Sequence, residues 1–254
     1  MKANSKITTV FASISLILVG AFYSPDTPIA SADSTLTVFA ASSMSEVLTK
    51  IGSDYRRANP GTSITFSFLA SSALATQINN GAPADLFISA SLVDIQKVRS
   101  KISTITPFLK NRVVIGVPKH SALLRSKDLN SSSVKWIQCV HTAPCGVAAD
   151  TALAAERVVT GKPVSLEANA SAVVAKVLAG EADAGIMYHT DVMAHSKELR
   201  AIGFRKGASA QTTYALGVID SSANVSSAEL FKAYIISPKV LTYLNHRGFT
   251  LISK

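Results

Sequence analysis

Short apolar segments alternate with amphipathic ones along the chain, and this alternation constrains the fold more than any other feature. Residues 36–40, 64–69 and 86–89 have the pattern of strands, and residues 44–58 and 72–80 between them have helical spacing. Strands that alternate with helices favour parallel sheets in an α/β architecture. We expect further strands at 112–117, 163–166, 184–188 and 214–219, and further helices at 91–98, 146–159, 171–178, 228–236 and 239–245.

The division of the chain into lobes follows from two isolated strands. Residues 112–117 and 214–219 are the natural crossings between two bodies. We therefore expect lobe one to comprise residues 33–112 and 218–254, and lobe two to comprise residues 113–217. Ligands of open α/β sheets bind beyond the carboxyl ends of the strands, so a binding site is expected there.

The first 32 residues have the pattern of an export signal. Lys2 and Lys6 precede an apolar run, residues 7–22, and Ala30-Ser31-Ala32 is the small-x-small pattern that a signal peptidase accepts. The run is short for a membrane span, although a retained N-terminal anchor is the alternative. We expect cleavage after about Ala32 and a protein exported to the periplasm or cell-surface space.

The charge balance is basic. The chain has 25 Lys and Arg against 16 Asp and Glu, a net charge of +9. Removal of residues 1–32 takes away Lys2, Lys6 and Asp26 and leaves +8. Such a charge attracts acidic partners. Export, and basic pairs without interleaved aromatic residues, argue against nucleic acid, which leaves an anionic surface or a small anion.

Three turns place small residues between a strand and a helix: residues 40–44, 70–72 and 143–146. Free N–H groups at the start of a helix bind anions, helped by the helix dipole. For each turn alone, simple helix capping by a serine is the ordinary explanation. Three such turns in one chain favour an anion pocket.

Enzymatic chemistry has no motif in this sequence. The chain lacks G-x-S-x-G, H-E-x-x-H, G-x-x-x-x-G-K and G-x-G-x-x-G. We expect no catalytic residues and no cofactor, with an exported serine hydrolase as a distant alternative.

The two cysteines leave one structural question open. Cys139 and Cys145 lie six positions apart, and export permits a disulfide that closes a small loop. Two separate thiols are the alternative, because spacing does not fix geometry. Two cysteines alone cannot supply a four-ligand zinc site.

Several segments together carry a family resemblance. They are residues 36–43 (LTVFAASS), 68–78 (FLASSALATQI), 81–90 (GAPADLFISA), 143–146 (APCG), 180–188 (GEADAGIMY) and 247–250 (RGFT). In this order they resemble the periplasmic molybdate-binding proteins of ABC transporters. The resemblance implies a two-lobe periplasmic-binding-protein fold of type II, hinged by two crossing strands, with an anion cleft between the lobes.

The resemblance also implies a ligand set. Two serine hydroxyls, two backbone amides and a tyrosine hydroxyl would hold molybdenum as its oxyanion, without direct ligation of the metal. By position these are Ser43, Ser71, Cys145, Ala170 and Tyr188. Unprotonated molybdate only accepts hydrogen bonds, and this set offers donors without a carboxylate. We interpret the neighbouring Asp85 and Asp183 as structural.

The implied function is capture of molybdate, and of tungstate, by a monomeric binding subunit that delivers the oxyanion to a membrane permease. A binding protein for sulfate, thiosulfate or another tetrahedral oxyanion is the alternative. Sulfate has shorter bonds, so a closed cleft would leave some donors unpaired, at a cost of roughly 1–3 kcal/mol each.

Overall fold

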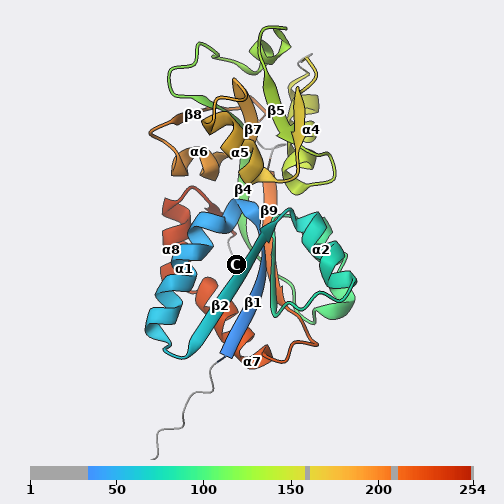
Figure 1. Ribbon diagram of the computed structural model, residues 1–254, viewed down its shortest axis with the longest axis vertical. Coiled ribbons are helices and arrows are strands. Elements are labelled where there is room, and N and C mark those ends of the chain that lie inside the picture. Colours follow the sequence, from blue (N-terminus) through green and yellow to red (C-terminus); the bar gives the residue numbers. More distant parts are fainter. Residues whose placement is uncertain (1–33, 158–160, 207–210, 253–254) are drawn as a thin grey trace, which may run out of the picture. The chain divides into compact units, whose positions relative to one another are not determined.

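The structure is a computed structural model that describes residues 34–157, 161–206 and 211–252 (Figure 1). The expected export signal, residues 1–32, lies outside the described residues, and so do the last residues of the helix expected at 146–159. Within the described ranges, we find no helix with both the length and the apolar character needed to cross a membrane.

The first sheet forms the base of lobe one. Its strands are β1 (Ser34–Ala41), β2 (Thr62–Leu69), β3 (Leu86–Ser89), the first half of β4 (Thr106–Pro118), β9 (Gln211–Val218) and β10 (Thr250–Leu251). The strand order is β2-β1-β3-β9-β4, and β10 pairs with β4. The helices packed against it are α1 (Ser45–Ala58), α2 (Ser71–Asn79), α3 (Leu92–Gln96), α7 (Val225–Ile235) and α8 (Pro238–His246).

The second sheet forms the base of lobe two and shares β4 with the first. Its other strands are β5 (Trp136–Cys139), β6 (Ser165–Glu167), β7 (Ala184–Tyr188) and β8 (Leu199–Ile202). Its helices are α4 (Pro144–Glu156), α5 (Ala170–Leu178) and α6 (His189–Ala194). Three 3₁₀ turns complete the described elements: η1 (Ser42–Met44), η2 (Arg99–Lys101) and η3 (Ser126–Asn130).

The expectation of parallel sheets is correct only for part of each sheet. β1 is parallel to β2 and β3, and β5 is parallel to β6 and β7. β4 and β9 are antiparallel to each other; β9 is also antiparallel to β3, and β4 to β7, β8 and β10. The reason is topological: β4 carries the chain out of the first sheet and β9 brings it back, so they run in opposite directions between the lobes (Figure 1).

Each lobe has its own hydrophobic core, which makes it a rigid support for a binding site. The first sheet is covered on both faces: Val38 and Ala40 belong to one cluster, and Phe39 between them belongs to another. Lobe two is packed around a third cluster that includes Trp136 and Ile186. The molecule is thus a two-lobe α/β fold of the type II binding-protein class.

Candidate binding cavity

The five residues of the implied ligand set line one small cavity of about 10 Å³. Its walls are Ala41, Ser42, Ser43, Leu69, Ala70, Ser71, Ala90, Pro144, Cys145, Ala170 and Tyr188. These residues lie at or just beyond the carboxyl ends of β1, β2, β3, β5, β6 and β7. Both sheets therefore contribute their ligand-binding ends to the same space.

Two backbone amides reach the cavity from the first turns of helices. Pro144 is the first residue of α4 and Cys145 the second, so the Cys145 N–H has no carbonyl one turn earlier to bond. Ala170 is the first residue of α5. The side chain of Asn169 caps this helix by accepting from Ala172 N at 3.1 Å, which satisfies a different N–H from that of Ala170.

The two serines occupy similar positions in lobe one. Ser71 begins α2 and is fully buried, and its Oγ accepts a hydrogen bond from Ala90 N at 2.9 Å. Because that bond uses a lone pair, the Ser71 hydroxyl hydrogen is left to donate. Ser43 lies in η1, and its Oγ is 2.7 Å from the hydroxyl of Tyr214.

Tyr188 contributes the most informative atom of the cavity. It is the last residue of β7 and is 1% exposed, and its hydroxyl has no hydrogen-bond partner. Among the described residues, only Gln138 Oε1 and Thr212 Oγ1 share that condition. Burial raises the pKa of Tyr188 well above its usual value, so the phenol remains a donor. An unpaired buried hydroxyl costs roughly 1–3 kcal/mol, which a bound acceptor would recover.

The turn that carries the Cys145 amide is held tightly. Sequence spacing left the pairing of the cysteines open, and in the structure Cys139 and Cys145 form a disulfide with their Cα atoms 5.7 Å apart. The next residue, Gly146, has no room for a side chain, because an added Cβ would lie 2.0 Å from the carbonyl oxygen of Val140. The amide is therefore fixed by a covalent link on one side and a close backbone contact on the other.

The cavity walls hold no charged side chain. The Asp85 and Asp183 side chains instead accept hydrogen bonds from backbone N–H groups. Asp85 accepts from Thr37 N and Asp183 accepts from Lys135 N. In the described ranges, no three His, Cys, Asp or Glu side chains are grouped so that they could hold a metal ion. An anion in this cavity would be held by neutral donors alone.

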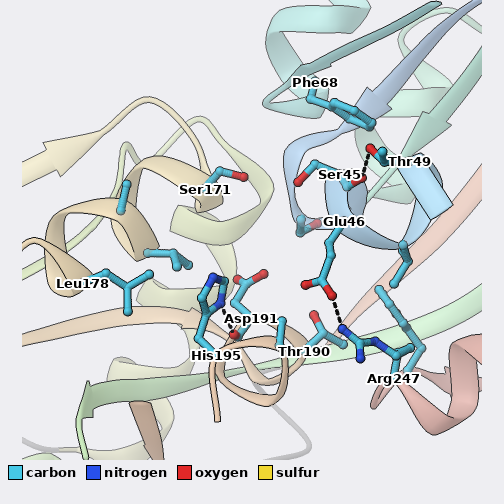
Figure 2. A pocket seen from close by; sticks show the side chains of 16 residues that line it. Ser45, Glu46, Thr49, Phe68, Ser171, Leu178, Thr190, Asp191, His195 and Arg247 are labelled. Carbon is cyan, nitrogen blue, oxygen red and sulfur yellow. Dashed lines mark hydrogen bonds and ion pairs between the residues drawn. The ribbon is translucent and has the colours of Figure 1, made fainter. Parts of the chain in front are cut away.

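A larger hollow adjoins the cavity at Ser43, between α1 on one side and α5 and α6 on the other (Figure 2). Ionisable side chains gather here: Glu46 pairs with Arg247, and Asp191 and His195 lie opposite. Burial raises the pKa of Asp191 to about 7, with the charge of Glu46 adding to the effect and the Tyr188 N–H opposing it. Ionisable side chains thus line the larger hollow and are absent from the cavity walls.

Sequence reasoning missed three residues that support this site. Tyr214 and Asn111 lie behind Ser43, and Ser171 of α5 donates to the carbonyl of Ser42 at 3.1 Å, a direct contact between the lobes. The sequence held little to identify them. A tyrosine in an expected strand is an ordinary strand residue, and only the pairing of β4 with β9 brings Asn111 near it.

Comparisons with known proteins found related sequences and similar folds. The family profile described as "Bacterial extracellular solute-binding protein" matches residues 36–250. The chain is 32% identical over 224 residues to the molybdate-binding protein ModA of Mycobacterium tuberculosis, covering 85% of this chain and 84% of that protein.

Among solved structures, the periplasmic molybdate-binding protein of Azotobacter vinelandii has a similar fold, with a TM-score of 0.72 and 18% identity over 86% of this chain and all of that one. The sulfate-binding protein SubI of Mycobacterium tuberculosis also does, with a TM-score of 0.69 and 14% identity over 87% of this chain and 88% of that one. At these identities the two likenesses concern the fold alone.

Proposed function

The chain belongs to the bacterial extracellular solute-binding proteins, and on that premise we propose that it captures molybdate and tungstate and delivers them to the membrane permease of an ABC importer. One observation carries the proposal. The Tyr188 hydroxyl is buried, protonated and unpaired at a small cavity whose other polar groups are hydroxyls and first-turn amides. A tetrahedral oxyanion supplies the acceptors that these donors lack.

The chemistry of the donor set supports an unprotonated dianion. Ser43, Ser71, Tyr188 and the amides of Cys145 and Ala170 all have a hydrogen to donate, and no wall residue is a carboxylate. Hydrogen phosphate carries a proton that needs an acceptor, so it fits this set less well. Sulfate carries no proton but has shorter bonds, and its rejection depends on how closely the lobes approach.

The remaining parts of the proposal concern activity and partners. We propose a monomer that binds and releases its ligand without catalysis, cofactor or nucleic acid. The two cavity serines are engaged with Tyr214 and with the Ala90 amide, and neither bond is to a histidine that could activate a nucleophile. Export with a cleaved signal peptide, residues 1–32, belongs to the same proposal.

The test is calorimetric titration of residues 33–254 with molybdate, tungstate, sulfate and phosphate. We expect tight binding of the first two and no heat from the others. Ser43→Ala and Ser71→Ala should each weaken molybdate binding by about 1–3 kcal/mol, because each removes a donor to a charged ligand. Ser72→Ala is the matched control, since Ser72 follows Ser71 in α2 but is not a wall residue.

The outcomes separate the alternatives. Binding of sulfate without molybdate would keep the cavity and change the ligand. An absence of binding heat with all four anions would mean that the serines in these turns act only as helix caps. Hydrolysis of an ester reporter that Ser43→Ala or Ser71→Ala abolishes would point to the hydrolase alternative.

A further inference from the structure

Two side chains outside the five-residue set connect one of its members to the crossing strands. The hydroxyl of Tyr214, on β9, is 2.7 Å from Ser43 Oγ, and it is 3.4 Å from Nδ2 of Asn111, on β4. Tyr214 is fully buried and Asn111 is 3% exposed. These three side chains form a hydrogen-bonded series that runs from β4 to the wall of the cavity.

The positions of the protons in this series follow from its fixed end. The backbone N–H of Arg112 donates to Asn111 Oδ1 at 2.8 Å, and a backbone N–H can only donate, so the orientation of the Asn111 amide is determined. Its Nδ2 therefore donates to Thr190 Oγ1, 2.9 Å away, and to the oxygen of Tyr214. Nδ2 offers Tyr214 no acceptor, and the neighbouring Tyr188 hydroxyl makes no hydrogen bond, so the Tyr214 hydrogen is directed to Ser43 Oγ.

We propose that Asn111 and Tyr214 are positioning residues that hold the Ser43 hydroxyl as a donor toward the cavity, and thereby make the site select unprotonated tetrahedral oxyanions. Ser43 Oγ uses a lone pair to accept from Tyr214, so its own hydrogen is available to the ligand. Such a series of bonds also strengthens each member. A ligand that carries its own O–H therefore finds one hydrogen-bond acceptor fewer in the cavity, because the lone pair of Ser43 is already used by Tyr214. The choice of molybdate as the probe rests on the proposed function.

The packing around Tyr214 allows its hydroxyl to be tested separately from its ring. The ring lies edge-on to Tyr188 at 6.1 Å between centroids and to Phe249 at 5.5 Å. Tyr214→Phe keeps these contacts and removes only the hydroxyl. Asn111 and Tyr214 belong to the two strands that pass between the lobes. The direction of the hydrogen bonds in the series therefore depends on the pairing of these two strands.

The decisive experiment is a double-mutant cycle. Ser43→Ala, Tyr214→Phe and the double variant are titrated with each oxyanion that the parent binds, chosen from molybdate, tungstate, sulfate and phosphate. Tyr214→Phe should weaken binding about fivefold, the effect of one hydrogen bond. The double variant should bind like Ser43→Ala alone, because Tyr214 acts only through Ser43.

A second measurement excludes a merely structural role. In Tyr214→Phe the Ser43 hydroxyl is free to accept, so phosphate, which the parent is expected not to bind, should begin to bind while molybdate weakens; a loosened cavity would weaken molybdate without admitting phosphate. Tyr55→Phe is the matched control: Tyr55 is a buried tyrosine of lobe one, packed on Phe231 at 4.9 Å. It should bind molybdate like the parent and, like the parent, give no heat with phosphate. Thermal unfolding confirms that each variant is folded.

The outcomes distinguish this inference from the proposed function. Losses that add in the double variant, or a Tyr214→Phe variant that binds like the parent, overturn the positioning role and leave the function intact. A parent that binds sulfate but not molybdate overturns the function, and the cycle run with sulfate still decides the role of Tyr214. A parent that binds none of the four anions overturns both.

Discussion

At the scale of single residues, the Tyr188 hydroxyl should strengthen ligand binding but lower the stability of the ligand-free protein. Its hydroxyl is unpaired in the protein and would be paired only by a ligand. Tyr188→Phe should therefore weaken molybdate binding roughly ten- to one-hundred-fold, as expected for a bond to a charged group. Without ligand, the same variant should unfold at an equal or higher temperature, because a buried unpaired hydroxyl has been removed. Calorimetry and thermal unfolding measure the two effects.

The two measurements together also distinguish the loss of a hydrogen bond to the ligand from damaged packing. A variant that lost both affinity and stability would indicate damaged packing, since the Tyr188 ring also contacts Tyr214. Unchanged affinity would instead mean that the ligand does not reach this hydroxyl.

Asp191 gives a second prediction at this scale, on pH. Burial raises its pKa to about 7 from an ordinary 3.8, so the folded protein holds this proton more tightly than the unfolded chain does. The stabilising contribution is complete below about pH 4 and is lost as the pH rises toward 7. Asp191→Asn, which can still accept from the Tyr188 N–H, should flatten this part of the pH profile of the free energy of unfolding. Urea denaturation between pH 4 and 8 measures it, and parallel profiles would contradict the assignment.

At the scale of elements, the disulfide defines the turn before α4. It closes a loop with a sequence separation of six, and loop-closure entropy predicts a stabilisation of about 2 kcal/mol. The double variant Cys139→Ala/Cys145→Ala should lose about that much and should bind molybdate more weakly, because the turn that aims the Cys145 amide is released. Denaturation and titration of the variant, beside the oxidised and reduced parent, measure both losses. Reduced parent and variant should behave alike.

The disulfide also changes how single substitutions are interpreted. The sequence predicts that Cys145→Ala is nearly silent for affinity if only the backbone N–H is used. In the structure that variant breaks the disulfide and leaves Cys139 with a free thiol. It therefore tests the geometry of the turn together with the donor.

The elements also show how far the sequence could be interpreted. Strands and helices with a clear period were predicted to within a few residues; β3 and β7 have the predicted bounds, and α1 begins one residue later than expected. β5, β8, β10 and α6 were not predicted, because each is short and, unlike the apolar run of β3, mixes polar residues such as Gln138, Arg200 and Asp191 with apolar ones. β4 begins six residues earlier than expected, since Pro107 and Lys110 interrupt its apolar pattern.

The cavity was predictable to a different degree. Serine turns at strand ends indicated an anion site, and the resemblance selected residues that the fold brings to one space. The residues behind them were not predictable, because their role arises from pairing between distant segments: Asn111 and Tyr214 are 103 positions apart in the chain. Whether the five wall residues bind molybdate remains the prediction that titration tests.

At the scale of the whole molecule, charge and cavity are separated. The chain carries a net charge of +9, yet no wall residue of the cavity is charged. The electrostatic field of the protein should therefore act on molybdate as it approaches. The association rate constant should fall severalfold as salt shortens the screening length, while the dissociation rate constant should change little. Stopped-flow measurements across a range of NaCl concentrations test this. A dissociation rate that rises as steeply as association falls would mean that charged groups touch the ligand.

The position of β9 has a consequence for the order of events during synthesis. This strand lies between β3 and β4 in the first sheet, but it follows all of lobe two in the sequence. A chain that emerges from its amino end therefore presents β1, β2 and β3 long before the strand that pairs with β3, and α7 and α8 come later still. Pairing over such separations is slow, so lobe one completes its core last. A protein with this topology stays partly unfolded, and so able to pass through a pore as an extended chain, until nearly the whole polypeptide has been synthesised.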